Sequence, residues 1–229
     1  MRLDNAKASL SKSRPNTTLV VHYHPFMIDP QTAPDGEAYA EYNRRRWGGD
    51  GWTHSMKRMG RKEGAPYANW VTWPNTTHCS RLLLLAEEHG MGDAVIGRLY
   101  AACYEEGQNV SLRSTVARIA AEVGVPGGEA FVMSNERFDQ LEEALNRPVR
   151  PSAAICQAMP RVPRLVRHLS RAQIANGKRV RAAPTFSLRV GDTPAASFSG
   201  AQEAEQWVSI LEQLADYTES MAARNTRVE

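Results

Sequence analysis

Three cysteines, Cys79, Cys103 and Cys156, are the residues of this sequence best suited to covalent chemistry. Disulfide exchange needs a thiolate, and a helix N-terminus together with a nearby second thiol lowers the thiol pKa enough to supply one. The three cysteines are far apart and no two form a Cys-x-x-Cys pair. Cys79 lies near a predicted helix start without a second thiol, and Cys103 has helical spacing with Leu99. We therefore assign no catalytic residue and expect Cys79 and Cys103 to be buried small apolar residues, whereas Cys156 could be exposed.

Histidines and tryptophans offer two further candidate sites. His22 and His24 alternate in the run from Leu19 to His24, as a metal-binding pair on one strand face would. No Asp, Glu or Cys stands nearby at ligand spacing, so we expect ordinary strand histidines and no metal. Trp70 and Trp73 bracket an aromatic loop, which we interpret as packing of a helical cap, with a hydrophobic peptide groove as the alternative.

Hydrophobic periodicity predicts the elements that position these residues. The run at 19–24 is β-branched and aromatic, which is typical of a strand. Asn75 or Thr76 can cap a helix that ends at Glu88, and Ser111 can cap another. The other predicted elements are a helix from 39 to 47, one from 93 to 106, one from 164 to 175, strands at 185–190 and 196–199, and a helix from about 202. This order, with a helical block before a β-β-α ending, fits the back half of a thioredoxin-like fold without singling it out.

Charge and hydropathy exclude several classes of protein. The 28 basic and 25 acidic residues are interspersed and give a net charge of only +3, so we expect no nucleic-acid partner. No apolar run approaches the ~20 residues that a membrane span requires, and we expect no membrane partner. The polar N-terminus has no apolar core of a signal peptide, which predicts a cytoplasmic protein.

Four segments of the sequence form a recognisable set. They are His-Pro-Phe-Met-Ile-Asp-Pro at 24–30, Asn-Thr-Thr-His-Cys-Ser-Arg-Leu-Leu at 75–83, the helix end at 99–111, and Ala-Ala-Pro-Thr-Phe at 182–186 with Phe-Ser-Gly-Ala-Gln at 198–202. Together they resemble the FrnE-type branch of the DsbA-like thioredoxin family. Each is weak alone, but the four occur in the family's order and spacing. Ser80 departs from the family's His, and Ala182-Ala183 departs from its Gly-Val.

The start of the chain departs further from the family. Arg2-Leu3-Asp4 aligns with a helix that follows the family's first strand and Cys-Pro-Trp-Cys turn, so no residues remain for either. The resemblance therefore implies an α/β fold, a thioredoxin-like sheet with an inserted helical subdomain, in which the first strand and active-site turn are absent. Either an upstream segment is missing from the sequence as given or the redox centre has been lost. The bared edge beside Leu19 to Tyr23 would favour self-association.

The resemblance also implies a domain plan and a binding site. Residues 1–30 and 164–222 would form the thioredoxin-like core, 31–133 the helical subdomain, and 134–163 an irregular insertion. Pro184 would be a cis-proline, with Ala183 and Thr185 offering backbone groups to an extended peptide or thiol substrate. A trans-proline opening an edge strand is the alternative. Asn75 would face the same cleft, although a helix cap explains it equally well.

Three functions are compatible with these features. The first is a thiol–disulfide oxidoreductase that is redox-inactive as written, because the catalytic dithiol is missing. The second is a glutathione-dependent isomerase or transferase of the related kappa-class branch, in which glutathione would be the ligand. The third is a non-catalytic module that binds peptides. We expect no other cofactor.

Overall fold

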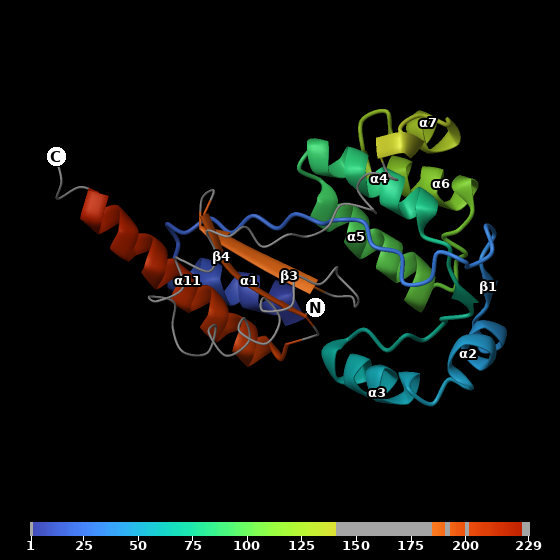
Figure 1. The fold of residues 1–229 in the computed structure, drawn as a ribbon, viewed down its shortest axis with the longest axis horizontal. Coiled ribbons are helices and arrows are strands. Elements are labelled where there is room, and N and C mark those ends of the chain that lie inside the picture. The colour runs from blue at the N-terminus through green and yellow to red at the C-terminus, as the bar shows by residue number, and fades with distance from the viewer. Residues whose placement is uncertain (1, 141–184, 191–192, 200–201, 226–229) are drawn as a thin grey trace. The chain divides into compact units, whose positions relative to one another are not determined.

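The chain groups into two compact units. The structure, a computed structural model, describes residues 2–140, 185–190, 193–199 and 202–225. Residues 20–147 belong to one unit, and residues 1–19 with 148–229 belong to the other (Figure 1). Each unit has its own hydrophobic core. The predicted plan of a core at 1–30 and 164–222 with two insertions stays a prediction.

The unit of residues 20–147 is mainly helical. Its described helices are α2 (Tyr39–Trp47), α3 (Thr53–Glu63), α4 (Thr77–Glu88), α5 (Gly92–Tyr100), a π-helical turn (Ala101–Glu105), α6 (Arg113–Val123) and α7 (Gly128–Met133). Helix α4 packs against α5 and α5 against α6, with α7 covering α4 and α6 (Figure 1). Gly48, Gly64 and Gly124 adopt left-handed conformations that end α2, α3 and α6.

Two kinds of side chain fill the core of this unit. Aliphatic residues of α4, α5 and α6, including Leu82, Val95 and Ile119, are fully buried, and each contributes about 1.5–3 kcal/mol through burial. Beside them, a short antiparallel ladder joins β1 (Glu37–Ala38) to β2 (Thr72–Trp73). The ladder brings Tyr42 onto Trp73, whose rings stack at 3.9 Å. The interpretation of Trp70 and Trp73 as core packing is confirmed, because both are buried in this cluster.

The second unit joins the two ends of the chain. Helix α1 (Arg2–Ser13) packs on α11 (Ala204–Asn225), and Ala6 and Leu10 contact the buried face of α11 that Trp207 and Ile210 share. Strands β3 (Thr185–Val190) and β4 (Thr193–Ser199) form an antiparallel hairpin. Its register shifts between Leu188 and Arg189, next to Pro194, which has no N–H to donate to a ladder.

The described elements confirm most predicted helices and both predicted C-terminal strands. The predicted strand from Leu19 to His24 is wrong, because residues 17–27 form neither helix nor strand. No other strand pairs with it among the described residues; instead the Tyr23 N–H donates to Glu87 Oε1 at 3.1 Å. The sheet edge expected beside it is therefore not formed there. Helices α3 and α7 were not predicted, and the helix predicted at 164–175 lies outside the described residues.

Candidate functional site

Three of the segments that carry the resemblance meet at the N-terminus of α4, where the Thr77 hydroxyl donates to Met27 Sδ of the segment at 24–30 at 3.9 Å. Asn75, just before α4, donates from Nδ2 to the Thr32 carbonyl at 2.9 Å. Its backbone N–H donates to Ser111 Oγ at 3.0 Å. Asn109 completes the junction by donating from Nδ2 to the Asp35 carbonyl at 2.8 Å. These bonds fix the loop at 27–36 against the start of α4 and the chain before α6.

Asn75 lies one residue before Thr76, the N-cap of α4, and bonds the first residue of the helix. Its Oδ1 accepts hydrogen bonds from the Thr77 N–H at 3.1 Å and from Thr77 Oγ1 at 2.7 Å. Because Oδ1, Nδ2 and the backbone N–H all have partners, Asn75 positions the loop and the helix together. Its predicted part in substrate binding stays a prediction. The prediction that Ser111 caps α6 is wrong, because Leu112 is the N-cap residue. The Ser111 hydroxyl instead accepts the hydrogen bond from the Asn75 N–H.

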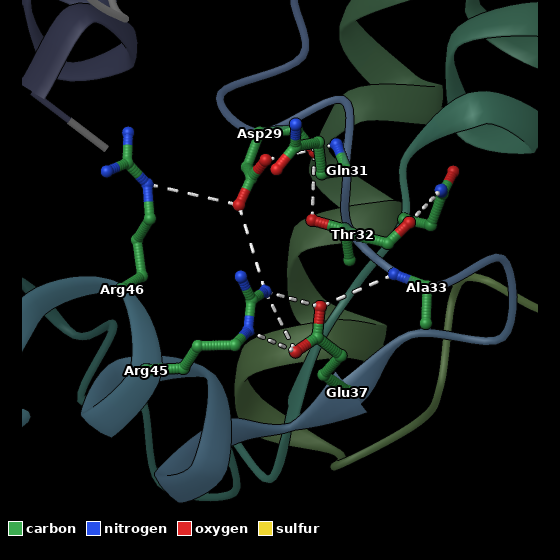
Figure 2. Close-up of polar contacts among 8 residues, drawn as sticks. Asp29, Gln31, Thr32, Ala33, Glu37, Arg45 and Arg46 are labelled. Atoms are coloured by element: carbon green, nitrogen blue, oxygen red, sulfur yellow. Dashed lines mark hydrogen bonds and ion pairs between the residues drawn. The ribbon is translucent and has the colours of Figure 1, made fainter.

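Asp29 organises the loop at 27–36, as Figure 2 shows. Its Oδ1 accepts from the Gln31 N–H at 3.0 Å, and its carbonyl accepts from Thr32 Oγ1 at 2.9 Å. Arg45 and Arg46 each approach Asp29 Oδ2 to 3.9 Å, and Arg45 binds Glu37 more closely at 2.8 Å. Hydrogen bonds within the loop and two guanidinium groups from α2 thus hold the loop in place.

Tyr42 lies beneath this charge cluster. Its side chain is fully buried, and its hydroxyl lies near Asp29 but outside hydrogen-bond geometry. Burial and the neighbouring Asp29 charge raise the pKa of Tyr42 to about 12. Tyr42 is therefore a neutral core residue and no acid–base group.

Cys79 and Cys103 are free thiols in the core, as predicted. The Cys79 thiol donates to the Val110 carbonyl at 3.2 Å. Burial raises the pKa of Cys79 strongly, and burial raises the pKa of Cys103 to about 12. Neither forms a thiolate near neutral pH, so neither can attack a disulfide. Cys156 lies outside the described residues.

His22 and His24, which we expected to be ordinary strand histidines, lie in a stretch that forms no strand. His22 Nδ1 lies 2.9 Å from Glu87 Oε2 and joins the chain to α4. No group of three metal-ligating side chains occurs in the described part of the chain. His78, at the start of α4, has a lowered pKa because of burial and the charges of Arg113 and Arg81.

Only part of the predicted peptide site can be located. Ala183 and Pro184 lie outside the described residues, and Thr185 is the first residue of β3, opposite Ser199 of β4. Among the described strands, β3 pairs with β4.

Arg81 is a buried residue that sequence reasoning did not single out. Its guanidinium is fully buried and donates to four backbone carbonyls: those of Phe131 (3.0 Å), Val132 (3.2 Å), Ser134 (3.0 Å) and Glu136 (2.8 Å). It thereby fixes the end of α7 to α4. The available signal in the sequence was an arginine directly before the four leucines at 82–85.

Comparison with known proteins defines the class. A family model described as a DSBA-like thioredoxin domain matches residues 3–147. The chain is thus a thioredoxin-like protein. More narrowly, because the match covers more than half of the sequence, it belongs to the DsbA-like family. The match includes the three segments that meet at α4 and ends before Pro184. A search of curated proteins found no match. No helix in the described ranges has the length and apolar character of a membrane span.

Proposed function

We propose that this protein serves the thiol–disulfide chemistry of the DsbA-like family by binding an extended peptide, and that the 229 residues given do not exchange disulfides with it. Family membership is the observation that carries the first half of the proposal. The FrnE-type branch and a cis-Pro184 belong to the same proposal, on the strength of the sequence resemblance.

The state of the thiols supports the second half. The sequence has no Cys-x-x-Cys pair, and Cys79 and Cys103 are buried with raised pKa values. A nucleophilic thiol needs exposure and a depressed pKa, and these two have neither property. Exchange by this chain would depend on Cys156 alone, without a resolving partner.

The position of β3 supports the binding role. Thr185, its first residue, directly follows Pro184, and main-chain hydrogen bonds to a strand give affinity for extended peptides with little demand on sequence. The proposed ligand is therefore a peptide in β conformation rather than a helix.

Two measurements test the proposal. In an insulin assay with dithiothreitol, the chain should not accelerate reduction over dithiothreitol alone. In fluorescence anisotropy, a labelled Val- and Thr-rich peptide of zero net charge should bind, and Pro184→Ala should weaken binding several-fold. Pro194→Ala, in the partner strand β4, is the matched control and should bind as the unchanged chain does.

Three results would contradict parts of the proposal. Accelerated reduction that Cys156→Ser abolishes would make Cys156 a reactive thiol. Equal peptide binding by the Pro184→Ala and Pro194→Ala variants would place the peptide elsewhere. Displacement of the peptide by glutathione would favour the kappa-class alternative.

A further inference from the structure

The segment of α2, α3 and their connection carries two exposed tryptophans beside a buried aromatic cluster. Trp47 and Trp52 are 49% and 41% exposed, and their rings meet edge to face at 6.2 Å. Trp52 also contacts the buried rings of Trp70 and Trp73 at 6.3 and 6.4 Å. We call Trp47 and Trp52, with the adjacent Arg44 and Arg46, the tryptophan edge.

The tryptophan edge is held in one conformation before any partner arrives. Trp52 Nε1 donates to Asn43 Oδ1 at 2.8 Å, and Asn43 is itself fully buried and donates to the Tyr39 carbonyl. Arg46 lies over the Trp47 ring at 4.6 Å. Fixed aromatic side chains lose little conformational entropy on binding, which is why tryptophan is enriched among the residues that dominate interface energies.

The same segment carries an excess of positive charge. Residues 39–63 contain seven basic and three acidic residues, a net charge of +4, whereas the whole chain carries only +3. Arg44 stands three residues before Trp47 on α2, so the two side chains are neighbours on one helix face. Arg45 differs, because Glu37 already holds it at 2.8 Å. Arg46 approaches Asp29 only to 3.9 Å and its side chain stays 47% exposed. Arg44 and Arg46 beside the tryptophans would complement carboxylates on a partner.

We propose that the tryptophan edge binds an acidic segment of a partner protein that carries aromatic or aliphatic side chains between its carboxylates. The apolar side chains would pack on Trp47 and Trp52, and the carboxylates would pair with Arg44 and Arg46. This interaction is separate from the peptide site proposed at β3.

The geometry of the two rings favours an acidic peptide over a nucleic acid. The planes of Trp47 and Trp52 cross at 62°, so the pair offers no continuous flat surface on which successive bases could stack.

Fluorescence anisotropy with a labelled peptide in which Glu alternates with Leu and Phe tests the proposal on the full chain. Trp47→Ala should weaken binding about ten-fold, the effect of losing one dominant interface residue. Tyr100→Ala is its control, since Tyr100 is likewise exposed and is the last residue of α5. Arg44→Glu should weaken binding and reduce its salt dependence. Lys12→Glu is the matched control, because Lys12 is exposed in the last turn of α1.

Several outcomes would overturn the proposal. One is that the acidic peptide does not bind the full chain, and another is that each variant and its control bind it equally well. Single-stranded oligothymidine or phosphatidylglycerol vesicles that displace the labelled peptide at a lower concentration than unlabelled peptide does would also contradict it. A dimer in light scattering that Trp47→Ala dissociates would also overturn it, because a second copy would then occupy the edge. Circular dichroism melts establish that each variant is folded.

Discussion

At the residue scale, Arg81 shows how one buried charge can order a loop. Its side chain has no carboxylate partner among the described residues, and four backbone carbonyls accept its hydrogen bonds instead. The rings of Phe131 and Phe138 face its guanidinium at 4.9 and 4.2 Å. Hydrogen bonding and aromatic contact thus offset the cost of burying the charge.

Replacing Arg81 should therefore be costly. Arg81→Ala leaves buried carbonyls without donors and should lower the free energy of unfolding by about 3–4 kcal/mol. Arg113→Ala is the matched control, because Arg113 binds the neighbouring carbonyls of Met133 and Ser134 from a half-buried position. Urea unfolding followed by circular dichroism measures both. If both variants lost the same free energy of unfolding, the burial of Arg81 would make no extra contribution to stability.

The buried thiols predict a dependence of stability on pH. An unfolded thiol ionises near pH 8.5, whereas Cys79 and Cys103 remain protonated in the folded chain up to much higher pH. Since the unfolded state then binds fewer protons, stability is complete below about pH 8.5 and falls as pH rises towards 12. The loss should be about 1 kcal/mol for each thiol between about pH 8.5 and 9.5.

Alanine variants separate this effect from other titrations. The difference in unfolding free energy between pH 8.5 and 9.5 should shrink by about 1 kcal/mol in Cys79→Ala and again in Cys103→Ala. Tyr42 does not interfere, because an unfolded tyrosine ionises only near pH 10. An unchanged slope in both variants would mean that the thiols ionise in the folded state.

At the element scale, local patterns predicted the helices and failed where structure depends on distant partners. The apolar spacing in α4, α5 and α6 was sufficient to place them. The run from Leu19 to His24 has strand composition, but its chain bonds to Glu87 rather than to another strand. Helix α3 was missed because its polar residues leave only Met56 and Met59 as apolar signals.

The junction at α4 was equally beyond local patterns. Asn75 and Ser111 are 36 residues apart, and Asn109 and Asp35 are 74 apart. The sequence marked the three segments by resemblance, and only the packed chain shows that they bond to one another.

Gly36 tests this junction. Its φ of +80° suits glycine, and an added Cβ would lie 2.6 Å from Ser111 Oγ and 2.9 Å from Thr72 Cγ2. Gly36→Ala should therefore cost about 1–2 kcal/mol for the left-handed backbone and about 1–3 kcal/mol more for displaced neighbours. Gly90→Ala is the control, with a φ of +68° and no atom near its Cβ position. If thermal melts show the same loss of stability for both variants, the loop at 27–36 moves to accommodate the added Cβ without an energetic cost.

At the scale of the whole molecule, two separate cores predict two separable unfolding events. The core around Leu99 and Val116 lies wholly within residues 20–147, whereas Leu10 and Trp207 belong to the core that the chain ends build. Cooperative unfolding as one unit is therefore not expected for this chain.

Leu10→Ala should destabilise one core and spare the other. Leu10 is 4% exposed and contacts the α11 cluster, so its truncation should cost about 2–5 kcal/mol in that unit. Hydrogen–deuterium exchange, resolved by peptide, should speed up in α1 and α11 and stay unchanged in α4, α5 and α6. Leu99→Ala, at the same 4% exposure in α5, should give the converse pattern. If either variant accelerates exchange equally in both units, the two cores stabilise each other and the chain unfolds as one body.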